Sequence, residues 1–283
     1  IRERFNEFAD FLFQPIKGGI HMSLIAQLRK QNPVVLTVAN MVTPADVANG
    51  LNVLGASPIM SKAPEEAEDM VKIAQAVTIN LGTVEAAQRK EMLAVMDAAQ
   101  FLEVPAVFDP VACAGSAYRT QVANELLNKY HFACIRGNAG EIAALAGIDW
   151  QSHGIDAGSG DGDLTAIAQK CAQKYQTVVA MTGAVDIITD GQKVIKVPFG
   201  SPLFAVHVGT GDMLSSIIAA FIGLGGSVLE AAATACEVFA LAGQAAANKT
   251  QMPSRWYDMF LDNLYQADDQ LIAAWQTELQ KED

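Results

Sequence analysis

Aromatic residues, cysteines and positive charges are all scarce in this sequence. Aromatic side chains make up 7% of the 283 residues, and 19 Lys and Arg stand against 31 Asp and Glu, so the formal net charge is −12. That acidic balance argues against a nucleic-acid surface and against a patch that binds anionic membranes. The four cysteines show neither C-x-x-C spacing nor the spacing of a zinc cluster. They indicate reduced, buried thiols, and we predict a cytoplasmic protein.

The sequence also lacks a long hydrophobic run that is free of polar residues. The most apolar region, residues 201–247, is interrupted by several glycines and by residues that include His207, Asp212 and Glu237. A membrane-spanning helix needs about 20 predominantly apolar residues. We therefore predict two core helices in this region and no membrane span.

The first segment of the chain differs in composition from the rest, with four phenylalanines in I-R-E-R-F-N-E-F-A-D-F-L-F. We predict that residues 1–21 are an extension derived from an expression vector and that residues 22–283 form the natural domain. The alternative is a native amphipathic helix, because Phe5, Phe8 and Leu12 share one helical face.

Beyond that segment, short apolar strand-like runs alternate with helical segments. V-V-L-T-V (34–38) is typical of a buried strand, and a helix is expected to start after Thr43 as its N-cap. The alternation, without repeats or low-complexity linkers, predicts a single α/β domain with a mostly parallel central sheet and helices on both faces. Asp190-Gly191 lies between two alternating apolar runs and predicts a hairpin that adds antiparallel pairing.

A glycine turn followed by an apolar run is the most informative motif. Gly209 and Gly211 flank Thr210, and glycine permits positive φ and close approach to its backbone. The residues that follow are apolar on nearly every face, which predicts a buried helix whose first N–H groups form an anion hole at Gly209, Thr210 and Gly211. Asp212 beside this hole indicates a base acting on a hydroxyl that attacks a bound phosphate. The alternative is a helix-capping carboxylate, worth about 1 kcal/mol.

Polar residues also stand at the ends of several predicted strands, namely Asn40, Asp109, Arg136, Asn138 and Thr182. In open α/β sheets, ligands bind at the carboxyl ends of the strands. A structural cap explains each of these residues taken alone. Together with the glycine turn, they predict an active site at that edge of the sheet.

Some of these residues predict a phosphate and metal site. Glu141, three residues after Asn138, would hold the waters of a Mg²⁺ ion, which prefers one or two carboxylates plus phosphate oxygens. The alternative for Glu141 is a place in the first turn of a helix. Asp109 is expected either near the metal and phosphates or as the cap of the next helix. Arg136 is the predicted cation for nucleotide phosphates, with a surface salt bridge as the alternative.

Two common nucleotide motifs are missing. Leu214 occupies the place of the third glycine in G-x-G-x-x-G, which argues against a dinucleotide site of the Rossmann type. The sequence has no G-x-x-x-x-G-K-[ST] loop, which excludes the P-loop kinases.

The sequence resembles the hydroxyethylthiazole kinase family of the ribokinase-like kinases. The motifs that carry the likeness are A-N-G-L-N-V-L-G-A-S-P-I-M (48–60), A-P-E-E-A-E-D-M (63–70), F-D-P-V (108–111), I-R-G-N-A-G-E-I-A-A-L-A-G (135–147), M-T-G-A-V-D-I-I-T-D-G (181–191) and V-G-T-G-D-M-L (208–214). The resemblance implies transfer of the ATP γ-phosphate, with Mg²⁺, to the hydroxyl of 4-methyl-5-(2-hydroxyethyl)thiazole in thiamine biosynthesis or salvage. It also implies a homotrimer with active sites at subunit interfaces. The alternatives are a related kinase of hydroxymethylpyrimidine or pyridoxal and a catalytically inactive protein that binds nucleotide or thiazole.

The resemblance also implies roles for individual residues. Met60 and Gly209 match thiazole-binding positions, and Asn40 matches the strand-end asparagine near the thiazole. Arg136 and Thr182 match ATP-binding positions.

Asn138 and Glu141 match the motif that organises magnesium, and Asp212 takes the place of the catalytic base. Many members of the family have cysteine at that position, whereas the wider ribokinase-like group has aspartate. The loop after Asp109-Pro110 also departs from the family's glycine-richer form.

Overall fold

One eight-stranded sheet organises the chain. The computed structural model describes residues 22–148 and 161–279. The strands run in the order β2-β1-β3-β4-β5-β6-β7-β8, with bounds β1 (Val34–Val38), β2 (Ser57–Met60), β3 (Ala76–Asn80), β4 (Ala106–Asp109), β5 (Cys134–Asn138), β6 (Val178–Thr182), β7 (Asp186–Thr189) and β8 (Val194–Val197). The pairings from β2 through to β6 are parallel, and β7 and β8 add antiparallel pairs. The predicted mixed, mostly parallel sheet is therefore confirmed.

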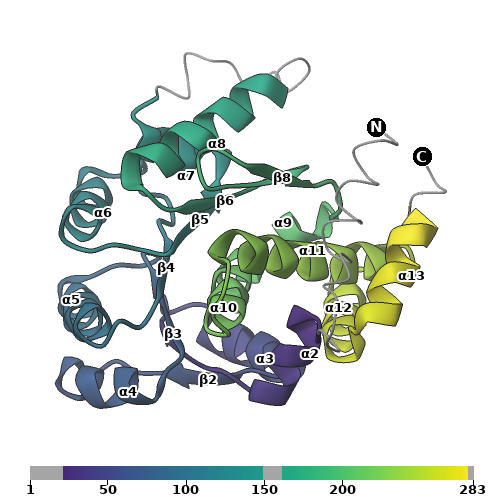
Figure 1. Ribbon diagram of the computed structural model, residues 1–283, viewed down its shortest axis with the longest axis horizontal. Coiled ribbons are helices and arrows are strands. Elements are labelled where there is room, and N and C mark those ends of the chain that lie inside the picture. Colours follow the sequence, from purple (N-terminus) through teal and green to yellow (C-terminus); the bar gives the residue numbers. More distant parts are fainter. Residues whose placement is uncertain (1–21, 149–160, 280–283) are drawn as a thin grey trace, which may run out of the picture.

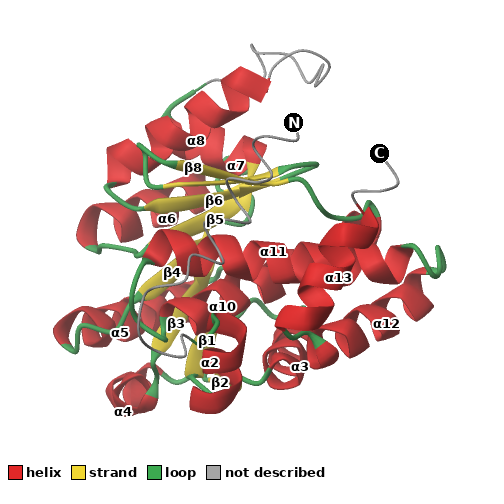
Figure 2. Cartoon of the chain, turned by 45° about the vertical axis from the view of Figure 1, so that its right-hand side comes forward, coloured by secondary structure: helices red, strands yellow, loops and turns green. Residues whose placement is uncertain are grey.

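Helices cover both faces of the sheet (Figures 1 and 2). One face carries α4 (Ala67–Ile73), α5 (Ala86–Phe101), α6 (Ala117–Lys129), α7 (Ala139–Ala146) and α8 (Asp161–Tyr175), with the short 3₁₀ turn η1 (Pro64–Glu66) before α4. The other face carries α2 (Leu24–Gln31), α3 (Pro44–Leu54), α9 (Leu203–Val206), α10 (Thr210–Ile222), α11 (Val228–Ala247), α12 (Pro253–Gln266) and α13 (Asp269–Leu279).

Each face of the sheet has its own apolar core. Adjacent residues of β1 show the alternation, because Val35 belongs to the core on the α10 side and Leu36 to the core on the α5 side. Burial on both faces explains why the strands are continuous apolar runs in the sequence. The predicted single α/β domain with helices on both faces is confirmed.

The two helices predicted in the most apolar region are α10 and α11. All residues of α10 other than Gly211 and Asp212 are buried. α11 is long and apolar enough to cross a membrane by length and composition, but 72% of that window is buried inside the protein. α11 is therefore a core helix, as the sequence predicts.

The predicted hairpin joins β7 to β8. Gly191 has φ +91°, and Asp190 accepts the N–H groups of Gln192 and Lys193 at 2.9 and 2.7 Å. The prediction for residues 1–21 lies outside the described residues, so it remains a prediction.

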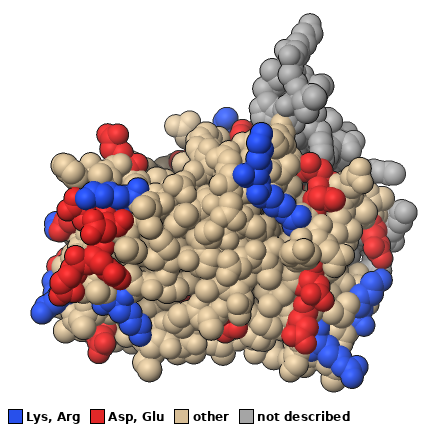
Figure 3. Space-filling model, turned by 90° about the horizontal axis from the view of Figure 1, so that it is seen from below, with Lys and Arg blue, Asp and Glu red and all other residues tan. Residues whose placement is uncertain are grey.

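Charges of both signs are intermixed on the face seen in Figure 3. They gather toward its two sides and leave a broad uncharged expanse between them. On α4, Lys72 pairs with Glu68 at 2.8 Å and with Asp69 at 3.6 Å, so one cation is shared by two acidic side chains.

Replacing Glu237 by Gln should stabilise the protein at pH 8. Glu237 is 2% exposed on α11 and accepts a 2.6 Å hydrogen bond from Gln276 of α13. Burial raises the pKa of Glu237 to about 7, above its value of about 4.3 in an unfolded chain. The folded protein therefore binds more protons between these values, and its stability falls as the pH rises from about 4 to about 7. Gln keeps the acceptor for Gln276 and removes the ionisation.

Thermal unfolding should give Glu237→Gln a higher Tm than the unaltered protein at pH 8 and a clearly smaller Tm difference at pH 5. The exposed Glu278→Gln on α13 is the control and should change neither value. A Tm difference that is the same at both pH values would contradict the assignment of buried charge to Glu237.

Candidate active site

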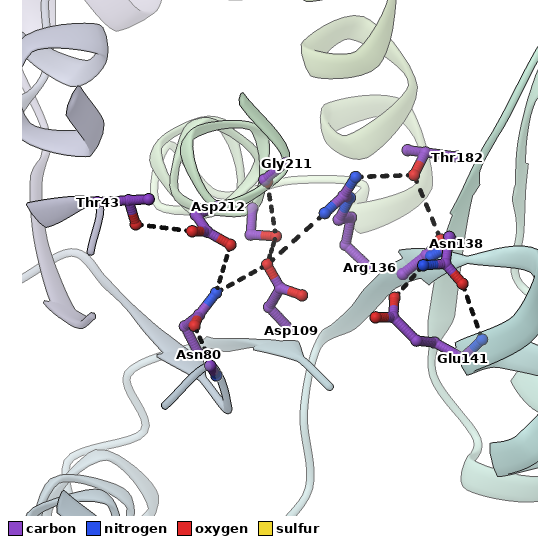
Figure 4. A network of polar contacts seen from close by, with 12 residues as sticks. Thr43, Asn80, Asp109, Arg136, Asn138, Glu141, Thr182, Gly211 and Asp212 are labelled. Atoms are coloured by element: carbon purple, nitrogen blue, oxygen red, sulfur yellow. Dashed lines mark hydrogen bonds and ion pairs between the residues drawn. The ribbon is translucent and has the colours of Figure 1, made fainter. Parts of the chain in front are cut away.

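Polar side chains from several strands meet at the N-terminus of α10. Asn80 and Asp109 are the last residues of β3 and β4 and stand opposite each other in the sheet register. Asn138 and Thr182, the last residues of β5 and β6, are also register partners. Parallel pairing thus brings to one edge residues that are far apart in the sequence (Figure 4).

Asp212 lies in the first turn of α10 and accepts three side-chain hydrogen bonds. Its Oδ2 accepts from Asn40 Nδ2 and from Thr43 Oγ1, each at 2.7 Å, and its Oδ1 accepts from Asn80 Nδ2 at 2.9 Å. Asp212 is only half-buried, whereas all three donors are 5% exposed or less. The donors fix the orientation of a carboxylate that remains accessible from outside.

Thr43 has a different role from the one expected of an N-cap. It occupies the N-cap position of α3, but its side chain makes no capping hydrogen bond. The hydroxyl donates to Asp212 instead, and the Thr43 N–H donates to Asn40 Oδ1 at 3.2 Å. Asn40 therefore holds the loop before α3 with its oxygen and Asp212 with its nitrogen.

Asn80 is a central residue that sequence reasoning missed. Its Nδ2 donates both to Asp212 Oδ1 at 2.9 Å and to Asp109 Oδ2 at 3.0 Å, so it links the two carboxyl groups. Its Oδ1 accepts from Asn40 Nδ2 at 3.1 Å and from the N–H of Gly82 at 2.9 Å. The sequence feature that could have indicated Asn80 is its polar amide at the end of the buried strand A-V-T-I-N.

Asp109 is fully buried between Asp212 and Arg136. Its Oδ2 also accepts from Ser215 Oγ at 2.7 Å, while Oδ1 is a buried oxygen without a partner among the described residues. Burial raises the pKa of Asp109 to about 7, although the nearby Arg136 lowers it. The expectation that Asp109 caps the next helix is wrong, because Ser116 caps α6.

Arg136 extends from β5 toward the start of α10. Its Nη2 donates to Thr182 Oγ1 at 2.8 Å, and its Nη1 lies 3.7 Å from Asp109 Oδ2. The side chain is only 14% exposed, so the alternative of a surface salt bridge is wrong. A Cβ placed on Gly211 would lie 2.5 Å from Nη1, so the guanidinium packs on a site that only glycine leaves open.

Of the two glycines in the turn, Gly209 has the positive φ that the sequence allows, whereas Gly211 lies within the first turn of α10. Gly209 has φ +93° and is the N-cap of α10. The N–H of Met213 bonds the Gly209 carbonyl at 2.9 Å, and the N–H groups before it have no intrahelical acceptor. The Thr210 hydroxyl donates to the Phe204 carbonyl at 2.9 Å, so Thr210 offers an anion its backbone N–H and not its side chain.

Asn138 and Glu141 form a capping box at the start of α7. Asn138 Oδ1 accepts from the N–H of Glu141 at 3.0 Å, and Glu141 Oε2 accepts from the N–H of Asn138 at 2.9 Å. Glu141 Oε1 also accepts from the N–H of Ala112 at 2.8 Å. The alternative of a first-turn carboxylate therefore describes Glu141 correctly.

These contacts still leave room for a magnesium role. An ionised carboxylate has about four acceptor positions, and each Glu141 oxygen uses one on a backbone N–H. Among residues 22–148 and 161–279, no group of three or more His, Cys, Asp and Glu forms a metal cage. A donor set of this kind fits Mg²⁺ held through waters and phosphate oxygens, the way this ion usually binds.

Met60 ends the edge strand β2 and stands opposite Thr37 of β1 in the register. β1 separates Met60 from β3, which carries Asn80. The structure therefore places Met60 at the same end of the sheet as Asp212, on the side away from Arg136 and Thr182. The predicted residues form two groups, one on each side of the start of α10.

Comparisons with known proteins agree on one family. The model described as the hydroxyethylthiazole kinase family matches residues 25–270. A hydroxyethylthiazole kinase from Limosilactobacillus fermentum is 56% identical over 252 residues, which cover 89% of this chain and 98% of that protein.

Solved structures show the same likeness. The hydroxyethylthiazole kinase protein from Pyrococcus horikoshii has a TM-score of 0.82 at 32% identity and covers 88% of this chain and 94% of its own. A ribokinase-like superfamily protein from Enterococcus faecalis has a TM-score of 0.62 at 14% identity, with 91% of this chain and 94% of that one covered. The second likeness shows the fold alone, and that fold is ribokinase-like.

Proposed function

Because this chain belongs to the hydroxyethylthiazole kinase family, we propose that it transfers the γ-phosphoryl group of ATP to the hydroxyl of 4-methyl-5-(2-hydroxyethyl)thiazole. It is a phosphotransferase of thiamine biosynthesis. The observation that carries the proposed chemistry is Asp212, a half-exposed carboxylate held by three donors at the first turn of a buried helix.

Asp212 acts as the general base. Asn40, Thr43 and Asn80 hold the carboxylate in one orientation, while its partial exposure leaves it open to a substrate hydroxyl. In the reaction the hydroxyl oxygen bonds the γ-phosphorus and the bond to the β-phosphate oxygen breaks. The hydroxyl proton moves to Asp212, and ADP leaves.

The glycine turn stabilises the phosphoryl group during its transfer. The N–H groups at the start of α10 and the positive end of the helix dipole lie next to Asp212. Such preorganised donors act on charge that develops in the transition state. Gly209 and Gly211 keep side chains out of this space.

Arg136 and Thr182 bind the nucleotide phosphates. The Arg136 guanidinium is already oriented by Thr182 and lies against Gly211. It therefore needs little rearrangement to bind a phosphate beside the glycine turn. Its Nε is buried and has no partner among the described residues, which leaves it a free donor.

Mg²⁺ would be held near Asn138 and Glu141 through its waters, and near Asp109 with its unpartnered Oδ1. When bound, the ion supplies positive charge that offsets the negative charge of the phosphates. The capping box fixes the side chains of Asn138 and Glu141 in advance.

The thiazole site lies on the other side of Asp212. Met60, Asn40 and Gly209 would contact the thiazole.

Near this side the exposed hydrophobic residues include Met41, Val42, Val206 and Val208, which are 74%, 61%, 59% and 69% exposed. Such a patch is typical of a subunit interface, and we propose that the enzyme is a homotrimer in which a partner subunit covers it. We place the enzyme in the cytoplasm, with residues 22–283 as its kinase domain.

An acceptor panel tests the proposed reaction. ADP release is measured with the thiazole alcohol, hydroxymethylpyrimidine and pyridoxal as acceptors. The thiazole alcohol should give the highest kcat/KM by a wide margin. Preference for another acceptor would reassign the substrate, and no turnover with any acceptor despite ATP binding would reject the kinase activity.

Thr43→Val should lower kcat roughly 10-fold, because it removes one hydrogen bond to the charged Asp212 while preserving side-chain shape. Thr43→Ser keeps the hydroxyl and should stay near the original kcat. Steady-state kinetics with ATP and the thiazole alcohol give both values. Equal kcat values for the two variants would show that the Thr43 hydroxyl does not support the base.

A further inference from the structure

Two rings outside the proposed site are connected to it. Tyr257 of α12 stacks on His207, with ring centroids 3.6 Å apart and planes at 9°. The Tyr257 hydroxyl donates to Asp46 Oδ1 at 3.1 Å. Asp46 lies in the first turn of α3, three residues after Thr43. One side chain therefore bridges the start of α3 and the segment before Gly209.

His207 anchors a segment that is otherwise exposed. Its neighbours Val206 and Val208 are 59% and 69% exposed, whereas the His207 side chain is half-buried against Tyr257. The His207 carbonyl also accepts from the Thr210 hydroxyl at 3.3 Å. The stack thus holds the chain two residues before the N-cap of α10.

Both segments that Tyr257 joins contain residues that position Asp212. On the α3 side, Thr43 donates to Asp212 at 2.7 Å. On the other side, Gly209 starts the helix that carries Asp212, and a Cβ on Gly209 would lie 2.6 Å from Thr43 Cγ2. The start of α3 and the turn are therefore in close contact near Asp212 and are joined again by Tyr257 farther out.

The phenol is well suited to a permanent link. Burial and the nearby carboxylate of Asp46 raise the pKa of Tyr257 above its usual value, so the hydroxyl remains a donor at neutral pH. A flat ring pair with one anchored hydroxyl has few rotamers, which favours a fixed distance between the two segments.

We propose that Tyr257 is a positioning residue for catalysis, which holds the His207 end of the glycine turn against the start of α3 and so keeps Asp212 aligned. It acts through His207 and Asp46 and does not touch the substrate. The proposal rests on the proposed role of Asp212 as base.

Four variants and a control test the proposal by kinetics: Tyr257→Leu, Tyr257→Phe, His207→Leu, the double variant Tyr257→Leu/His207→Leu, and Trp275→Leu as control. Tyr257→Leu removes the stack and should lower kcat about 10- to 100-fold with the KM for ATP unchanged, because small misplacements of reacting groups have effects of this size. Tyr257→Phe keeps the stack but removes the hydrogen bond to Asp46, so it breaks the bridge at one end and should lower kcat by less than Tyr257→Leu does. Tyr257→Leu and His207→Leu each remove the same stack. The double variant should therefore lose no more activity than Tyr257→Leu alone. Trp275 is buried in α13, which packs against α11, so Trp275→Leu should lower the Tm without lowering kcat.

Hydrogen exchange separates this proposal from the proposed function, because it needs no substrate. The hydrogen-bonded amides on either side of the turn, those of His207 and Met213, should exchange faster in Tyr257→Leu than in the unaltered protein and should not change in Trp275→Leu. A Tyr257→Leu protein with unchanged exchange, or with kcat within twofold of the original, overturns the positioning role. Failure of the unaltered protein to phosphorylate the thiazole alcohol would instead refute the proposed function.

Discussion

Asp212→Asn is expected to lower kcat roughly 10²–10⁴-fold while ATP still binds. The amide cannot take the proton of the substrate hydroxyl. It also presents an NH₂ group where the carboxylate accepts hydrogen bonds from three donors, so at least one of Asn40, Thr43 and Asn80 loses its acceptor. Steady-state ADP release gives kcat, and calorimetric titration gives the Kd for ATP.

The fold should survive this substitution, because Asp212 is half-buried and the core of α10 begins at Met213. Far-ultraviolet circular dichroism and the Tm serve as controls. Turnover close to that of the unaltered protein would remove Asp212 from the role of base. Loss of ATP binding would mean instead that the carboxylate organises the nucleotide site.

The sheet and its last hairpin were predictable because their signals are local. Apolar runs buried on two faces indicate parallel strands, and Asp190-Gly191 indicates a tight turn. The same holds for α10, whose apolar sequence predicts its burial. The capping box of Asn138 and Glu141 spans only four residues, which explains why the position of Glu141 in the first turn of a helix could be considered from the sequence.

Side-chain partners across the site were not predictable in the same way. Asn80 and Thr43 meet Asp212 across 132 and 169 residues of sequence. A polar residue at a strand end or an N-cap already has a local explanation, so nothing in the sequence requires a distant partner. The strand register determines these partners. The pairing of β3 with β4 places Asn80 beside Asp109, and α10 then brings Asp212 close to both.

Gly209→Ala should lower kcat about 10²-fold because the new Cβ displaces Thr43 from Asp212. This steric effect can be separated from backbone strain. Gly209 has φ +93° and Gly225, beyond the end of α10, has φ +83°. Alanine at either position costs about 1 kcal/mol because its Cβ disfavours positive φ. We therefore expect both Gly209→Ala and Gly225→Ala to lower the Tm through backbone strain, with any further loss in Gly209→Ala arising from its contact with Thr43.

Only one of these two alanines meets another side chain. A Cβ on Gly209 would lie 2.6 Å from Thr43 Cγ2, whereas a Cβ on Gly225 meets nothing within 4 Å. Relief of that clash moves Thr43 away from Asp212, so Gly209→Ala should lose activity and Gly225→Ala should keep it. Thr43→Ser removes Cγ2 and retains the hydroxyl, and Gly209→Ala/Thr43→Ser should therefore recover much of the lost kcat. A double variant as slow as Gly209→Ala would mean that the turn requires glycine for its backbone conformation alone, and that contact with Thr43 does not control the base.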